Sequence, residues 1–400
     1  MKVRQALWRQ GRWDKPLPSD LDSKRTVCFI FFGPEVELEE PRRELAQSFP
    51  SSHRVGCSGA GEISNAELLD DTLVLTVVQF ESSEIHSFCE KVSGPQDSFE
   101  AGKRLASAVD PKDLKALYIV SEGLAVNGTE LARGIYSVLP TSTLIAGGLA
   151  ADGTKFQKTT ILYNDSLSSG QVVAVAFYGE DLVIGMQANA GWLPFGPVRK
   201  ITSSQGNVLH TLDGSPALKL YKEFLGPSSS KLPASALMFP LLLGPKNEAL
   251  SRNTVRTILG IDEEKQSMIF AGDMPEGEFV RFMRVNARSL VEAAGECAGS
   301  CRQNMVPDTP ALSLMVSCVG QRLVLGITTD EEIEAVFHEL PPGSVQGGFY
   351  SYGELAPGNQ GHCDLHNQTV TLTWIQERPS DARASDSMTR DRDEFTRKNP

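Results

Sequence analysis

The chain has 400 residues, a formal net charge of −12, and 40% hydrophobic and 22% charged residues. This length is too great for one typical core and predicts two domains, while the composition is ordinary for a soluble globular protein. The negative charge disfavours nucleic acid and anionic membranes as binding partners.

The lack of a membrane helix or secretory signal and the cysteine usage both indicate an intracellular protein. No apolar run reaches the roughly 18 residues that a membrane helix needs, so we expect no membrane insertion. The charged N-terminal stretch MKVRQALWRQGRWD lacks the apolar core of a secretory signal. Seven cysteines, an odd number spread over the chain, favour a reduced compartment over a disulfide framework. We therefore expect a cytoplasmic location.

Residues 1–25 are polar and interrupted by prolines, which predicts a loose leader or an edge strand. Beyond them, apolar and β-branched runs predict strands, and longer periodic stretches with capping residues predict helices. The predicted strands are 26–32, 53–57, 72–80, 117–121, 143–146, 159–163, 171–178, 182–187, 236–243, 255–259, 267–270, 279–285, 312–318 and 369–375. The predicted helices are 37–48, 98–108, 127–138, 216–226, 331–340 and, longest of all, 286–304, with Asn286 as its cap.

Three segments repeat one layout, in which an apolar strand, a helix, a proline and a short strand lead to a glycine-rich turn. The turns read GCSGAGE (56–62), GGLAADG (147–153) and GGFYSYGE (347–354). Each segment is a βαβ unit, which favours parallel neighbouring strands. Because ligands collect at the carboxyl ends of such strands, we predict that the three turns line one shared pocket. The alternative is that the glycines only let strand and loop pack closely.

The predicted fold class is mixed α/β, with two modules of mixed β-sheets flanked by helices and built from repeated βαβ units. The first module is 26–226 and the second is 234–377, joined by the linker GPSSSKLP at 226–233. Residues 378–400 are charged and almost without aliphatic side chains, which predicts a disordered tail.

Polar and aromatic side chains follow the glycine-rich turns. Tyr352 and Glu354 belong to the third turn, which leads to His366 and Asn367, and these side chains supply an aromatic wall, a charge and polar groups. Glu62 matches Glu354 in position, and paired carboxylates can bind a cationic ligand or perform acid–base work. The alternative is that the turns are solvated or that each carboxylate only caps backbone amides.

Enzymatic and metal chemistry have weaker sequence signals. Cys57 lies at a strand end, where His366 or His362 could activate it as a nucleophile, or it is simply a small wall residue. The first turn lacks the last glycine of a hydrolase nucleophile elbow and the Gly-Lys-Ser/Thr of a P-loop. The cluster His362-Cys363-Asp364-x-His366 has metal-competent side chains, but no second cluster supplies the remaining ligands, so we predict no metal.

Several motifs in order resemble the FIST family, a pair of modules named FIST-N and FIST-C for F-box and intracellular signal transduction. They are GCSGAGEI, NGTELARGI followed by GGLAADG, GWLPFGP, LDGSPALKLY, SCVGQR, and GGFYSYGE followed by LHNQTVTLT. The resemblance runs from Val27 to Trp374, so the two modules predicted above are FIST-N-like and FIST-C-like. It implies a small-ligand sensor, with amino acids suggested as ligands, and no established catalytic activity.

The resemblance therefore implies a stand-alone sensory protein that binds a small molecule, such as an amino acid, and signals to a partner such as a histidine kinase or another output module. One branch of the family binds haem, senses nitric oxide and regulates a histidine kinase. A His often precedes the Gly-Trp of the aromatic turn in related sequences, and here that place is Ala190. Another side chain, from His210, His362, His366 or a cysteine, could take the place of that His as the axial ligand. Haem binding is therefore kept as an alternative to a protein without a cofactor. A cysteine-dependent enzyme acting through Cys57 is the other alternative.

We predict that ligand binding shifts the relative packing of the two modules, and that a partner reads this change. The predicted ligand-binding residues are Cys57, Ser58, Glu62, Asn127, Gly147, Gly148, Asp152, Trp192, Tyr352, Glu354, His366 and Asn367.

Overall fold

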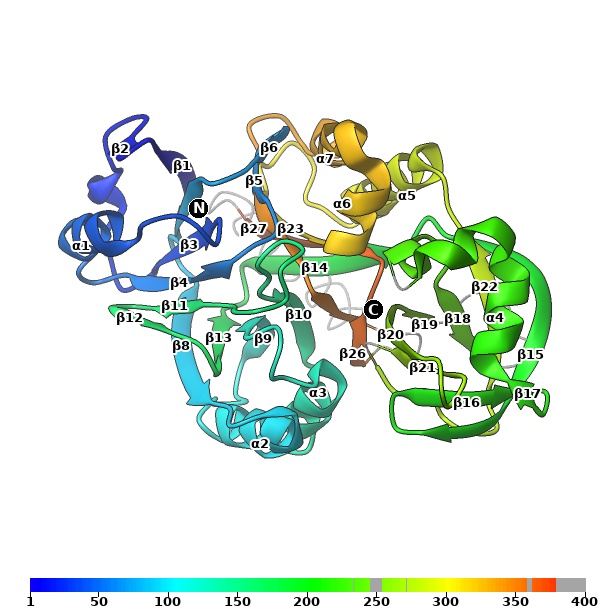
Figure 1. Cartoon of the computed structure of the whole chain (residues 1–400). Helices are drawn as coiled ribbons and strands as arrows, with labels where there is room; N and C mark the ends of the chain where they lie inside the picture. The colour runs from blue at the N-terminus through cyan, green and yellow to red at the C-terminus, as the bar shows by residue number, and fades with distance from the viewer. Residues whose placement is uncertain (233, 245–253, 271, 358–361, 379–400) are drawn as a thin grey trace, which may run out of the picture.

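The computed structural model describes residues 1–232, 234–244, 254–270, 272–357 and 362–378 (Figure 1). The predicted disordered tail lies outside the described residues except for Arg378. The fold is mixed α and β, as predicted, and the described residues form four sheets flanked by helices. Three of these sheets form one body, and the fourth lies beside it with α4 on its surface (Figure 1).

Each of the three predicted βαβ units is present, and its two strands pair in parallel as expected. The first unit is β3 (Thr26–Phe32), α1 (Glu39–Ser48) and β4 (His53–Ser58). The second is β9 (Leu114–Ser121), α3 (Gly128–Tyr136) and β10 (Leu144–Leu149). The third is β23 (Leu312–Cys318), α6 (Val319–Leu325), the 3-10 turn η6 (Gly326–Thr328), α7 (Thr329–Glu339) and β24 (Val345–Ser351).

Two further strands extend each unit in the same antiparallel order. They are β7 (Leu73–Gln79) and β1 (Lys2–Arg9) in the first sheet, β13 (Gln171–Tyr178) and β8 (Glu84–Lys91) in the second, and β27 (Val370–Glu377) and β14 (Leu182–Asn189) in the third. The segment predicted as a leader therefore contributes β1, because Ala6 and Trp8 bury their side chains in the core. A short strand, β2 (Arg12–Trp13), pairs with β1.

After its glycine-rich turn, each unit gives a hairpin to the sheet of another unit. The hairpin of the first unit joins the third sheet, that of the second joins the first sheet, and that of the third joins the second sheet. The hairpins are β5–β6 (Glu62–Ser64 and Glu67–Leu69), β11–β12 (Ile161–Tyr163 and Ser166–Ser168) and β25–β26 (Gly353–Pro357 and Cys363–His366). This cyclic exchange makes the three sheets topologically equivalent and ties distant parts of the chain together.

The three sheets share one apolar core that draws side chains from all three units. The ring of Phe31 lies 4.7 Å from that of Phe349, which joins the first unit to the third. The ring of Phe29 lies 5.4 Å from that of Tyr118, which joins the first unit to the second. Aromatic pairs at these separations add to the burial that holds the units together.

The fourth sheet has a core of its own beneath α4 (Ala217–Leu225). Its strands are β15 (Leu193–Gln205), β16 (Val208–Leu212), β17 (Ser215–Pro216), β18 (Leu241–Gly244), β19 (Thr254–Arg256), β20 (Ile258–Asp262), β21 (Ser267–Phe270) and β22 (Phe279–Arg284). The predicted strand 236–243 is wrong in its first half, where the 3-10 turn η4 (Ala234–Met238) precedes Pro240 and β18. The predicted linker forms another 3-10 turn, η3 (Gly226–Lys231), and the boundaries of the two modules stay a prediction.

The remaining α-helices lie close to their predicted ranges. Helix α5 spans Ala287–Arg302, and the Asn286 side chain accepts a hydrogen bond from the Ser289 amide, as predicted. Helix α2 spans Ser98–Ser107, and two 3-10 turns, η1 (Ser19–Leu21) and η2 (Pro95–Asp97), complete the set of named elements. Within the described ranges, none of the helices is both long and apolar enough to cross a membrane.

One glycine in each unit stands where a side chain would collide with the parallel neighbour. A Cβ atom at Gly56, Gly147 or Gly348 would lie 1.7 to 1.8 Å from a backbone carbonyl oxygen of the preceding strand. The three glycines also occupy the same register, opposite Ile30, Ile119 and Met315. Close backbone approach, the alternative considered for these glycines, is therefore a sufficient reason for them.

Gly147→Ala tests this packing constraint. The added Cβ would meet the Ile119 carbonyl oxygen, and the φ of +133° already disfavours a side chain. We expect a loss of about 3 kcal/mol or more in the free energy of unfolding, measured by urea denaturation. Gly295→Ala is the control, because its Cβ would meet only the Ala335 methyl at 3.8 Å and alanine favours a helix interior. Equal stability of the two variants would contradict the account.

Glu377, the last residue of β27, holds the turn before β8. Its carboxylate accepts hydrogen bonds of 2.7 to 2.8 Å from the backbone amides of Glu81, Ser82 and Ser83. Burial alone would raise the pKa of Glu377, but these hydrogen bonds outweigh it and lower the pKa from 4.5 to about 2. Glu377 thus stabilises the fold above its unfolded pKa, and this stabilisation is lost as the pH falls towards 2.

Glu377→Gln should lower the free energy of unfolding at pH 7 by about 2 kcal/mol, the order expected for hydrogen bonds to a charged group. The difference from the unchanged protein should shrink at pH 3, since the carboxylate then loses part of its advantage. Urea denaturation at both pH values measures this difference, with Glu84→Gln at an exposed site as the control. A difference that stays constant with pH would contradict the assignment.

Candidate functional site

The three glycine-rich turns meet, and they contact one another directly through a ring of backbone hydrogen bonds. The Ala60 amide donates to the Tyr350 carbonyl at 2.8 Å, the Ala151 amide to Ser58 at 3.0 Å, and the Tyr352 amide to Leu149 at 3.2 Å. Donors and acceptors hold equivalent positions in the three units. The predicted convergence of the turns is therefore present.

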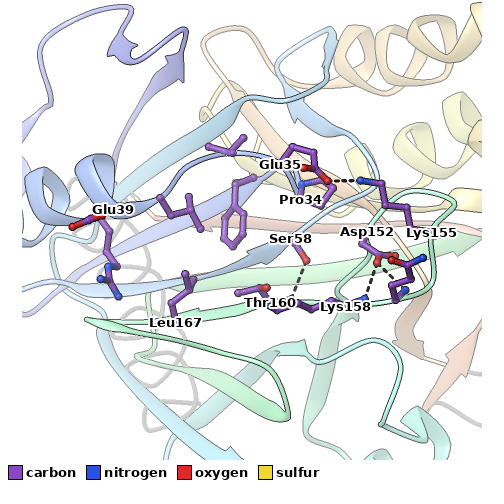
Figure 2. Close-up of a pocket in the computed structure, with 14 residues that line it drawn as sticks. Pro34, Glu35, Glu39, Ser58, Asp152, Lys155, Lys158, Thr160 and Leu167 are labelled. Carbon is purple, nitrogen blue, oxygen red and sulfur yellow. Dashed lines mark hydrogen bonds and ion pairs between the residues drawn. The ribbon is translucent and has the colours of Figure 1, made fainter.

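A cleft of about 490 Å³ opens beside this ring, at the carboxyl ends of β3 and β4 (Figure 2). Its volume lies in the range of small-molecule sites. One side is the loop after β3 with the start of α1, and the other is the loop from Asp152 to Thr160. Ser58 and Asp152 are the members of the predicted site among its lining residues.

Apolar and charged groups of both signs line the cleft. Phe32, Val36, Leu38 and Leu167 form its apolar part. The polar lining residues are Glu35, Glu39, Arg42, Ser58, Asp152, Lys155, Gln157, Lys158 and Thr160. The Lys155 ammonium pairs with the Glu35 carboxylate and joins the two sides (Figure 2). Such a lining suits a small molecule with both charged and apolar parts.

Asp152 shapes one side of the cleft. Its carboxylate accepts hydrogen bonds from the amides of Phe156, Gln157 and Lys158, and from the Tyr352 hydroxyl. The Tyr352 ring stacks on Phe156 with centroids 4.4 Å apart. Burial would raise the pKa of Asp152, but the Tyr352 and amide hydrogen bonds lower it overall, so the group is a carboxylate at neutral pH. Asp152 and Tyr352 therefore position the loop, with the oxygens of Asp152 already engaged.

Ser58 presents a buried hydroxyl on the wall of the cleft. Its Oγ accepts the Thr160 amide at 3.1 Å, and the side chain is only 1% exposed. Within the described residues, the Oγ–H itself has no acceptor. A buried donor without an acceptor costs free energy unless a ligand or water accepts from it.

Several other predicted site residues are engaged in holding the fold. The Asn127 side chain caps α3 by accepting from the Glu130 amide. Gly147 and Gly148 are packed against neighbouring strands, since a Cβ at Gly148 would lie 2.6 Å from Val316. The indole of Trp192 is buried and donates to the Gln368 carbonyl at 2.7 Å. None of these four residues lines the cleft, and their role as ligand contacts stays a prediction.

Cys57 lies inside the shared core of the three sheets, with no exposed surface. Burial, and secondly the nearby Glu62, raise the pKa of the Cys57 thiol well above its ordinary value. A nucleophilic cysteine needs a lowered pKa and access to substrate. The geometry thus matches a wall residue of the core.

Glu62 and Glu354 are both fully buried and also lie away from the cleft lining. Burial and the nearby Asp70 raise the pKa of Glu62 well above its ordinary value, against the opposing effect of Arg322. Burial raises the pKa of Glu354 to about 8, although Ser351 and Thr369 donate to its carboxylate. Burial thus disfavours the charged form of both groups, which does not suit the binding of a cationic ligand, and their role as ligand contacts stays a prediction.

The predicted histidine and amide groups lie on and after β26. His366 pairs with Glu354 in register, and burial lowers the pKa of its imidazole. Asn367 donates to the Tyr352 carbonyl at 3.4 Å. The 14 lining residues of the cleft include no histidine or cysteine, and the haem alternative stays a prediction. No cluster of three metal-competent side chains occurs within the described parts of the chain.

Most of the cleft residues that sequence reasoning missed lie on the segment after β3, including the start of α1, or on the loop after the second turn. Glu35, Glu39 and Arg42 follow β3, the first strand of its unit, whereas the sequence reasoning considered the turns after second strands. Lys155 and Lys158 follow the second turn by only a few residues. The rule that ligands collect at the carboxyl ends of parallel strands would have indicated both loops.

The burial of Cys57 makes a direct prediction for thiol labelling. In the folded protein at neutral pH, iodoacetamide should modify Cys57 more slowly than the half-buried Cys89, because thiolate content and access both favour Cys89. Mass spectrometry of peptides measures both rates, and unfolding in urea should make them similar. Rapid labelling of folded Cys57 would instead support the hypothesis of a cysteine-dependent enzyme.

Three comparisons relate the chain to known proteins, and the comparison with family models agrees with the sequence resemblance. An uncharacterized protein of Methanocaldococcus jannaschii is 25% identical over 298 residues, which are 67% of this chain and 56% of that protein's length. A crystal structure of cyanuric acid hydrolase from A. caulinodans aligns over 88% of this chain and 90% of its own, with 9% identity and a TM-score of 0.31. Family models match as FIST N domain over residues 26–215 and FIST C domain over 217–357. The chain thus belongs to the FIST family, whose domains are sensory and signal-transduction domains.

Proposed function

We propose that the protein is an intracellular sensor that binds a small zwitterionic molecule, such as an amino acid, in the cleft beside the turns. The observation that carries the proposal is the cleft itself, with its buried hydroxyl donor and charges of both signs. Family membership supplies the sensory role, and the signalling partner expected for it is a histidine kinase or another output module.

The chemistry of the lining fits the two ends of an amino acid. Lys158 is exposed and has no ion-pair partner among the described residues, so its ammonium is available to a ligand carboxylate. The Ser58 Oγ–H can donate to the same carboxylate. Glu39, on the opposite side of the cleft and likewise without an ion pair in the described ranges, can accept from the ligand ammonium. The apolar lining then receives the ligand side chain.

The position of the cleft gives a route for signalling. Its two sides come from different units, and the Lys155–Glu35 pair is the described salt bridge that spans them. A ligand that draws these sides together would act on Ser58 and Asp152, which connect directly to the ring of turns. The bound state would thus change how the units pack, and a partner protein would read that change.

Binding should appear as a thermal shift in a screen of the amino acids. A ligand at 100 times its Kd stabilises the folded state by about 2.7 kcal/mol, which raises Tm by several degrees. Titration calorimetry should then give a Kd that weakens about tenfold in Ser58→Ala and in Lys158→Ala, the change expected for one charge-assisted hydrogen bond.

The matched control for the charge is Lys112→Ala, at an exposed site outside the cleft, which should leave the Kd unchanged. Melting without ligand checks that each variant folds. The absence of any shift, or equal affinity in all three variants, would overturn the proposed ligand class and site.

A further inference from the structure

We infer that the corner formed by α6, η6 and the start of α7 is a docking surface for a basic segment of a partner protein with an apolar anchor. We call this surface, made of Leu323, Ile327, Asp330, Glu331 and Glu334, the α6–α7 corner. Leu323 is 45% exposed and Ile327 is 100% exposed. A fully exposed isoleucine next to a half-exposed leucine, four residues apart, provides an unpartnered apolar site.

Three exposed carboxylates follow the apolar pair in the chain, and one of them, that of Asp330, accepts a hydrogen bond from the Leu68 amide at 2.9 Å. Asp330, Glu331 and Glu334 are exposed, and none of them forms an ion pair among the described residues. The first two belong to the first turn of α7, where the helix dipole also favours them, but Glu334 lies beyond that turn. The net charge of −12 adds long-range attraction for a basic partner and repulsion for a second copy of this chain.

One residue, Arg322, also connects the corner to the ring of turns. Arg322, the neighbour of Leu323, donates to the Ala60 carbonyl and pairs with Asp70 at 2.7 Å. Its guanidinium lies 5.9 Å from the centroid of the Tyr350 ring. Ala60 and Tyr350 are donor and acceptor in the ring of turns, so a change in the ring acts directly on α6. The docking itself does not depend on which ligand the cleft binds.

The binding test uses a fluorescein-labelled helical peptide of about 18 residues with leucine on one face and lysine on the other. Fluorescence anisotropy at about 0.1 M salt should give a Kd at least tenfold tighter than for the same peptide with glutamate in place of lysine. Ile327→Ser should weaken the lysine peptide at least threefold. The double change Glu331→Lys and Glu334→Lys should weaken it at least tenfold and improve binding of the glutamate peptide.

Two matched controls separate this surface from general attraction to an acidic protein. Leu259→Ser removes a 52% exposed leucine from β20, and Glu100→Lys reverses an exposed carboxylate in the first turn of α2, which lies at the lower edge of Figure 1 while α6 and α7 lie at the upper edge. Both should change the Kd less than twofold. Equal losses in control and corner variants would overturn the inference. Light scattering that detects a dimer, lost in Ile327→Ser, would overturn it in favour of self-association.

Discussion

The backbone ring that joins Ala60, Ala151 and Tyr352 to their acceptors is the constraint on which the rest of the structure depends. Each hydrogen bond links two units, and the three together close a cycle. Before each ring residue, glycine is needed at Gly56, Gly147 and Gly348, because the second strand of each unit runs so close to the first that a side chain would strike a carbonyl oxygen. The ring then directs each following hairpin into the sheet of another unit.

The exchange of hairpins explains why several ionisable side chains near the turns are buried. Cys57 lies in the shared core, Glu62 and Glu354 lie on the exchanged strands β5 and β25, and all three are fully buried. Their pKa values rise because burial disfavours the charged form. The charged side chains that line the cleft therefore come from segments outside the ring, such as the loop of Lys155 and Lys158. A ligand can reach them there without entering the core.

Much of the fold could be predicted from the sequence, because local patterns govern it. Apolar runs such as 26–32 and 312–318 gave the buried strands, and Asn286 gave the start of α5. The repeated strand–helix–strand layout gave the parallel pairs. The exchange of hairpins could not be predicted, because β5 and β24 are far apart in sequence and no local pattern names the partner of a short strand. Of the predicted site residues only Ser58 and Asp152 line the cleft, and the third turn contributes no lining residue. The salt bridge from Glu35 to Lys155 joins loops separated by 120 residues, which no local pattern indicates.

Native-state hydrogen exchange of the Ala60, Ala151 and Tyr352 amides tests the central constraint most directly. If the ring holds the three units together, all three amides exchange slowly and with the same free energy of opening as the core strand amides of β3, β9 and β23. If one of them exchanges as fast as an exposed loop amide while the others stay protected, the ring is open in solution. The units would then be held by their apolar core alone.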